Sequence, residues 1–329
     1  MNPFTYVRPA DPQQAVDGIA GNATAKFLSG GTNLIDLMKM GVETPAHLID
    51  INRVGLSKIE ELPGGGVRIG ALVRNSDLAE HPLITQRYPV LSQALLAGAS
   101  PQLRNLATTG GNLLQRTRCY YFYDPAFPRC NKRNPGSGCG ALNGFNRIHA
   151  ILGQSEQCIA TNPSDMNVAL AALDGIVQVQ GPNGTRGISF ADFHRLPGET
   201  PNVDTNLHAD ELITSVDLPA MPFATRSHYL KVRDRASYAF ALVSVAAVLD
   251  LQDGNIKSAR VALGGVAHKP WRAQKAETAL AGKKANEEIF RAAAEAELAP
   301  ARAYKHNGFK IELAKRAIVR ALSTVAAMA

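Results

Sequence analysis

The four cysteines of this 329-residue chain are its clearest sign of a chemical site, because all of them lie between residues 119 and 158. Cys119, Cys130, Cys139 and Cys158 are separated by ten, eight and eighteen residues. No two are separated by only two residues, so the spacing differs from those of zinc ribbons and ferredoxins. Cysteines gathered in this way need a common cause, which is a pair of disulfides, a structural zinc ion or an iron–sulfur cluster.

The sequence around the cysteines suits a loop wrapped around a metal centre. Lys132, Arg133 and Arg129 would offset the negative charge of thiolates. Glycines that permit bends and expose backbone N–H groups follow at Gly136, Gly138, Gly140 and Gly144. The N-terminus lacks a basic region followed by an apolar core, so we expect no signal peptide. Disulfides are therefore the weakest of the three explanations.

Two glycine-bearing segments have the composition of a phosphate-binding loop. Ser29-Gly30-Gly31-Thr32-Asn33 lies between a predicted strand, 25–28, and a predicted helix, 34–40. Thr108-Thr109-Gly110-Gly111-Asn112 offers hydroxyls and bare backbone in the same way. Either segment alone could be an ordinary tight turn, and neither matches a G-x-G-x-x-G or P-loop motif. Together they predict a site for a ligand that contains a diphosphate.

The remaining pattern predicts a mixed α+β protein of two domains. Residues 25–51 read as a β-α-β unit, 77–99 as helical with proline breaks, and 113–159 as a long irregular segment. A helix is expected at 164–173, a hairpin at 244–263 around Asp253-Gly254-Asn255, and helices in the alanine-rich tail. We place a domain boundary near residue 222, between domains 1–222 and 223–329.

Composition excludes several functional classes. The formal net charge is +7, from 35 basic and 28 acidic residues, yet no nucleic-acid-reading motif accompanies it. The excess positive charge fits docking to an acidic partner better. No apolar run reaches the roughly 18–20 residues that a membrane span requires. The charged run from Lys231 to Tyr238 is expected to be a solvated strand edge, and no recognisable catalytic arrangement of side chains occurs, so we predict no catalytic residue.

In these motifs and their order, the chain resembles the FAD-binding subunits of the molybdenum hydroxylases, the family of the xanthine and carbon monoxide dehydrogenases. The resemblance rests on Lys26–Leu34, Ala107–Asn112, Asn162–Met166 and Leu263–Trp271, and it covers essentially the whole chain. It implies an FAD-binding domain of two α+β lobes, about 1–57 and 58–222, followed by a smaller C-terminal α+β domain.

The segment 113–159 departs from most members of this family, which run directly from the second glycine loop to the Ser164-Asp165 helix. An insert of this kind is similar to that of the bacterial periplasmic aromatic aldehyde oxidoreductases, where it carries a 4Fe-4S cluster. The resemblance therefore favours a 4Fe-4S cluster on Cys119, Cys130, Cys139 and Cys158. The flavin subunit of 4-hydroxybenzoyl-CoA reductase also has a cluster insert and is the nearest alternative.

The resemblance also implies which residues bind FAD. The first loop would wrap the diphosphate, Asp165 would bind FAD hydroxyls, and Ile213 and Lys231 would lie at the isoalloxazine ring. The implied cofactor-binding residues are Lys26, Phe27, Leu28, Ser29, Gly30, Gly31, Thr32, Asn33, Leu34, Thr108, Gly111, Asn112, Leu114, Asp165, Ile213 and Lys231.

The implied function is electron transfer within a molybdenum-dependent aldehyde oxidoreductase. Partner subunits would hold the molybdenum cofactor and 2Fe-2S clusters, forming a heterotrimer, and the FAD would reduce an external acceptor. By this resemblance the subunit is expected in the periplasm through co-export with a partner, or alternatively in the cytoplasm. Two other functional classes remain: a stand-alone flavin enzyme, and an assembly subunit that is stabilised by a structural zinc ion and has no redox chemistry.

Overall fold

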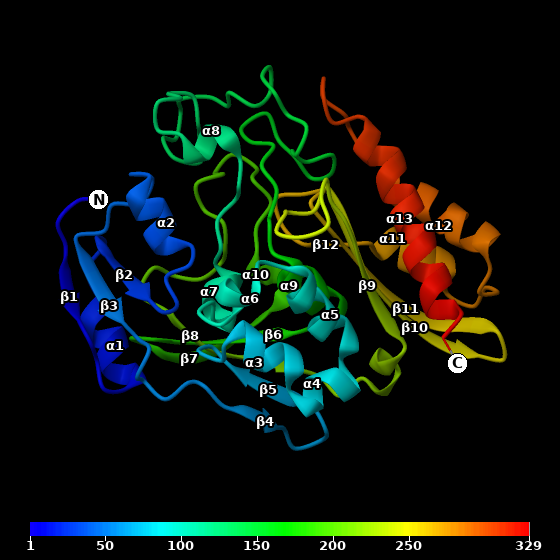
Figure 1. Ribbon diagram of the computed structural model, residues 1–329, viewed down its shortest axis with the longest axis horizontal. Coiled ribbons are helices and arrows are strands. Elements are labelled where there is room, and N and C mark those ends of the chain that lie inside the picture. Colours follow the sequence, from blue (N-terminus) through cyan, green and yellow to red (C-terminus); the bar gives the residue numbers. More distant parts are fainter. Residues whose placement is uncertain (329) are drawn as a thin grey trace.

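The N-terminal lobe contains a parallel three-stranded sheet with the strand order β1-β3-β2. The structure is a computed structural model, and it describes residues 1–328. Strand β2 runs into helix α2 and returns through β3 in parallel, which confirms the predicted β-α-β unit. The lobe consists of β1 (Thr5–Val7), α1 (Pro12–Ile19), β2 (Ala25–Leu28), α2 (Leu34–Lys39) and β3 (His47–Asp50). Figure 1 shows it in blue at one end of the molecule.

The second lobe is built on an antiparallel five-stranded sheet with the order β4-β5-β8-β6-β7. Its last strand in sequence, β8, lies in the middle and pairs with both β5 and β6. Its elements are β4 (Ile59–Glu61), β5 (Val67–Gly70), α3 (Asn75–Glu80), α4 (Pro82–Arg87), α5 (Pro89–Ala97), α6 (Pro101–Arg104), α7 (Thr109–Leu113), α8 (Tyr120–Tyr123), α9 (Asp165–Ala172), β6 (Ile176–Gly181), β7 (Gly184–Ser189), α10 (Phe190–Phe193) and β8 (Leu212–Leu218).

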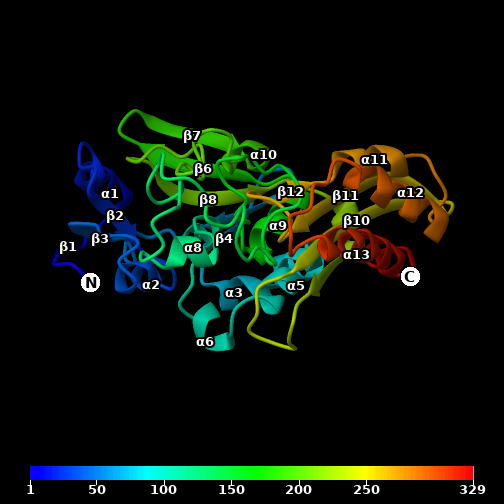
Figure 2. The same ribbon diagram turned by 90° about the horizontal axis from the view of Figure 1, so that it is seen from above.

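The C-terminal domain has a four-stranded sheet with the order β12-β11-β10-β9, covered on one face by helices (Figures 1 and 2). The predicted hairpin is confirmed, and Asp253 and Gly254 at its turn both have positive φ, as a type I′ turn requires. Its elements are the 3₁₀ helix η1 (Pro222–Thr225), β9 (Ser227–Val232), β10 (Val243–Gln252), β11 (Asn255–Gly264), β12 (Trp271–Arg272), α11 (Gln274–Leu280), α12 (Glu287–Leu298) and α13 (Phe309–Ala326).

Strand β10 joins the two domains because both of its faces are buried. Val245, Ala247 and Leu249 belong to the apolar cluster beneath helices α11–α13. The alternate residues, Ala246 and Val248, belong to the cluster of the second lobe, which includes helix α9. Every residue of α9 is buried as well. A continuous apolar run is therefore expected here in place of polar–apolar alternation.

The segment 113–159 is irregular, as predicted, apart from the single turn of α8. It lies above the sheets, between the N-terminal lobe and the C-terminal domain (Figure 1, green). Within residues 1–328, no helix combines the length and the apolar character needed to cross a membrane.

Lys310 anchors the last helix to this irregular segment. The side chain is fully buried, and its ammonium donates hydrogen bonds to the carbonyls of His149 at 2.8 Å, Ile148 at 3.3 Å and Gly265. One amine group thus satisfies carbonyls from two separate loops, which helps to hold α13 against the insert.

We predict that Lys310→Met lowers the free energy of unfolding by about 3 kcal/mol, since three buried carbonyls lose their donor. The midpoint of urea unfolding would measure this loss. Arg316→Met on the same helix is the matched control, because Arg316 is exposed and pairs only with Glu312. Equal midpoints for the two variants would show that Lys310 is not an anchor.

Candidate functional site

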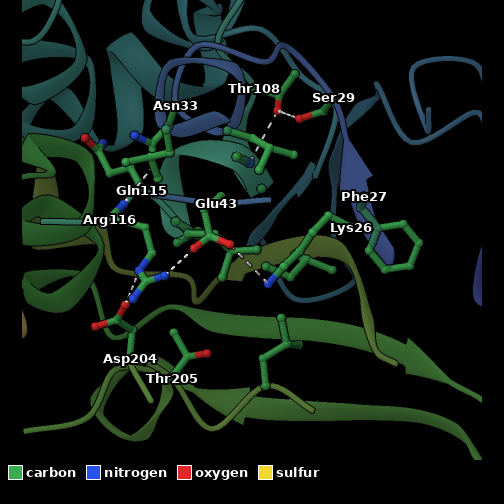
Figure 3. A pocket seen from close by; sticks show the side chains of 18 of the residues that line it. Lys26, Phe27, Ser29, Asn33, Glu43, Thr108, Gln115, Arg116, Asp204 and Thr205 are labelled. Carbon is green, nitrogen blue, oxygen red and sulfur yellow. Dashed lines mark hydrogen bonds and ion pairs between the residues drawn. The ribbon is translucent and has the colours of Figure 1, made fainter. Parts of the chain in front are cut away.

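The two glycine-bearing loops meet in the structure, although Ser29 and Thr108 are 79 positions apart in the sequence. The hydroxyl oxygens of these two residues are 2.9 Å apart. The Thr108 hydroxyl also accepts a hydrogen bond from the Gly111 amide and thereby caps helix α7. Figure 3 shows Ser29 and Thr108 joined in this way. The loops therefore form one continuous wall.

Gly30 makes this close approach possible. A Cβ atom at Gly30 would overlap the backbone carbonyl of Leu106, which cannot move aside as a flexible side chain could. Gly31 has a φ of +72°, a conformation that residues with side chains rarely adopt. Both glycines are thus required by the shape of the loops.

The loops line a cavity of about 350 Å³, a size typical of small-molecule sites. Most of the residues predicted to bind a cofactor line it: Lys26, Phe27, Leu28, Ser29, Gly30, Gly31, Thr32, Asn33, Leu34, Thr108, Gly111, Leu114 and Ile213. Asn112 lies behind this wall, where its side-chain oxygen accepts a hydrogen bond from the Ser164 hydroxyl at 2.7 Å.

A second cavity of about 330 Å³ adjoins the first and shares Thr161, Asn162 and Pro163 with it. Asp165 lies in its wall, at the first turn of helix α9. The first cavity is bordered by the glycine loops, and the second is bordered by residues of the C-terminal domain between 234 and 265.

Asp165 is held by two residues of strand β9. Its carboxylate oxygens accept hydrogen bonds from the Lys231 ammonium and the Tyr229 hydroxyl, both at 2.7 Å. Burial, followed by the charge of Asp165, raises the pKa of Tyr229 well above its ordinary value, so the hydroxyl stays a donor. Lys231 is almost fully buried, so the expectation of a solvated strand edge is wrong at this residue.

Ile213 and Lys231 lie on different sheets, in strands β8 and β9. Ile213 is part of the first cavity, whereas Lys231 contacts Asp165 and the Ala97 carbonyl beside the second. Their roles at a bound cofactor stay predictions.

Sequence reasoning missed an ionic network inside the first cavity (Figure 3). Arg116 binds Glu43 at 2.5 Å and Asp204 at 2.6 Å, and Lys26 lies 4.0 Å from Glu43. Burial by itself raises the pKa of Asp204, but the cations of Lys132 and Arg116 lower it to about 2. Lys26 and Lys132 were singled out for other reasons, whereas Glu43, Arg116 and Asp204 are scattered along the sequence, so no local signal marked the network that they form.

The four cysteines also come together, around a small cavity that all four line. Cys130 and Cys139 face each other across a short antiparallel clip, in which the Asn131 amide donates to the Gly138 carbonyl at 2.8 Å. No disulfide joins any of these four thiols in the structure. Burial raises the pKa of the Cys119 thiol to about 12 and that of Cys158 to about 11.

The surroundings of the cysteines differ in part from expectation. Arg133 does not face the sulfurs, because its guanidinium donates to the backbone carbonyls of residues 121, 122, 124 and 127. Lys132 and Arg129 do line the cavity. The sequence analysis missed His149, whose Nε2 lies 3.1 Å from the Cys119 sulfur.

Comparison with known proteins decides the family. Residues 2–221 match the FAD binding domain in molybdopterin dehydrogenase, and residues 228–325 match the CO dehydrogenase flavoprotein C-terminal domain. The chain is 55% identical to the aldehyde oxidoreductase FAD-binding subunit of Escherichia coli over the full length of both chains. It belongs to the FAD-binding subunits of the molybdopterin dehydrogenases.

More distant members agree with this assignment. The glyceraldehyde dehydrogenase medium chain of Sulfolobus acidocaldarius is 29% identical and covers 88% of this chain and 84% of its own. A carbon monoxide dehydrogenase chain from Hydrogenophaga pseudoflava has a TM-score of 0.76 at 27% identity, covering 98% of this chain and 97% of its own. The predicted fold class and the predicted FAD cofactor are thereby confirmed.

We predict that Gly30→Ala weakens FAD binding by about tenfold or more, because relieving an overlap with backbone costs about 1–3 kcal/mol. FAD released per chain on denaturation, measured against added FAD, would show this loss. Gly18→Ala is the matched control, since its Cβ would make only ordinary contact with Ile49. Full FAD retention in Gly30→Ala would contradict the proposed close packing of the loops.

Proposed function

We propose that this flavoprotein subunit transfers electrons within a molybdenum-dependent aldehyde oxidoreductase. The observation that carries the proposal is the cavity formed by two glycine loops, with a second cavity adjoining it, in a chain 55% identical to an aldehyde oxidoreductase FAD-binding subunit. In this role an aldehyde is oxidised to the carboxylic acid on a partner subunit. An FAD held by the two glycine loops would receive electrons from 2Fe-2S clusters of another partner and would pass them to an external acceptor.

The residues present fit FAD. Gly30, Gly31 and Gly111 line the first cavity, and the absence of side chains there lets the two loops pack together, so that the cavity is bordered by bare backbone of the kind that suits a diphosphate. The two adjoining cavities suit the length of a dinucleotide better than either alone. When bound, FAD supplies one- and two-electron transfer, and the protein positions it and adjusts its potential.

We also propose that Cys119, Cys130, Cys139 and Cys158 hold a 4Fe-4S cluster. The four sulfurs surround a cavity, which suits a cluster with one thiolate at each corner. A structural zinc ion would instead need all four sulfurs about 2.3 Å from one point. His149 is placed to donate an N–H···S hydrogen bond to Cys119, and the Ala160 amide lies 3.4 Å from the Cys158 sulfur, as is common at such clusters.

The remaining parts of the proposal concern assembly and location. The complex is a heterotrimer with a large molybdenum-cofactor subunit and a small 2Fe-2S subunit. It resides in the periplasm by co-export with a partner, with the cytoplasm as the alternative. The 45% hydrophobic composition and net charge of +7 are compatible with either compartment, so fractionation of cells is the direct measurement.

The cluster assignment predicts four iron atoms and four acid-labile sulfides per chain, beyond those of partner subunits. We expect Cys139→Ser to lose this iron and the matching low-temperature EPR signal, because a corner ligand is removed. Asn143→Ser, an exposed change in the same loop, is the matched control and should keep both. Zinc in place of iron, or full iron in the Cys139→Ser protein, would refute the assignment.

The electron-transfer role is tested on the subunit purified with its co-encoded neighbours. Aromatic aldehydes should bleach the flavin absorbance anaerobically, and an added acceptor should restore it, because electrons enter and leave through the FAD. An assembled complex that turns over aldehyde while its flavin stays oxidised would contradict this role.

A further inference from the structure

Lys132 is the one lysine that lines both the cofactor cavity and the cysteine cavity of residues 1–328. Its side chain is only 1% exposed, so water does not screen its charge. Although Lys132 is next but one to Cys130 in sequence, its ammonium turns towards the loop of residues 195–208, which supplies part of the cofactor cavity.

The position of this ammonium is fixed from several sides. It donates to the Pro201 carbonyl at 2.8 Å and to the Asp204 carboxylate. Asp204 is also bound by Arg116 at 2.6 Å, while His268 approaches it at 3.6 Å. Burial, followed by the charge of Lys132, lowers the pKa of His268 to about 4, so that imidazole is neutral near pH 7.

The charges of the network leave a positive excess between the two sites. Lys132, Arg116 and Lys26 are cations, and Asp204 and Glu43 are the carboxylates that they bind. Lys132 also lines the cavity that the four cysteines surround, so its charge lies beside the sulfurs. A buried cation stabilises whichever neighbouring group gains negative charge.

We propose that Lys132 is a positioning residue shared by both redox groups, whose buried charge raises the reduction potentials of the FAD and of the cysteine-bound cluster together. Addition of an electron makes either group more negative, so each is easier to reduce beside the ammonium. Asp204 has the opposite effect, since it partly cancels that charge while holding it in place. The inference rests on the proposed function, because it assumes the cluster.

Lys132→Met should lower both reduction potentials, by an amount that makes the equilibrium constant for reduction of each group about tenfold smaller. This corresponds to about 59 mV for the one-electron cluster and about 30 mV for the two-electron flavin. Asp204→Asn should move both potentials upward, because the carboxylate is lost and the cation stays. Potentials are measured by redox titration of the assembled complex, with flavin absorbance and cluster EPR as signals. Lys305→Met removes an exposed lysine and should change neither potential.

The opposite signs separate an electrostatic role from a structural one, since general damage would shift both variants in the same direction. If Lys132→Met does not assemble, an upward shift of both potentials in Asp204→Asn still supports the proposal. Unchanged potentials, or a shift at one group alone, in variants with full FAD and iron overturn it and leave the proposed function intact. A wild-type complex without iron on this chain overturns the cluster assignment and the shared role with it.

Discussion

The close passage of Gly30 beneath the Leu106 carbonyl sets the geometry on which the flavin site depends. Because no side chain stands between them, strand β2 and the loop before helix α7 can share a wall, and Ser29 reaches Thr108. The cavity therefore forms between two loops that are far apart in the chain. Any larger residue at this point would separate the lobes and open the site.

The charged side chains within the cavity are neutralised by ion pairs with one another, not by solvent. Arg116 lies between Glu43 and Asp204, and Lys132 adds a second cation to Asp204. Pairs of this kind contribute little net stability, because desolvation offsets most of the attraction. Their effect is to hold charges at fixed positions, which suits a site whose chemistry is the movement of electrons.

Buried polar contacts tie the insert to the elements around it. Lys310 ties residues 148 and 149 to helix α13, and Lys132 ties the cysteine segment to the wall of the cofactor cavity. Strand β10 meanwhile buries both faces and unites the C-terminal domain with the second lobe. A structural change in the cysteine segment should therefore alter the geometry of the flavin site, although the segment has almost no regular secondary structure.

Local features were readable from the sequence because each depends on neighbouring residues. Glycines at a strand-to-helix junction, the Asp253-Gly254 turn and the grouping of the cysteines predicted the β-α-β unit, the hairpin and a common thiol site. The insertion of β8 into the middle of its sheet, the network on Arg116 and the pairing of Asp165 with Lys231 were decided only by the tertiary structure. Contacts between residues 66 to 88 positions apart have no periodic signal along the chain, and they arise only when packing brings the elements together.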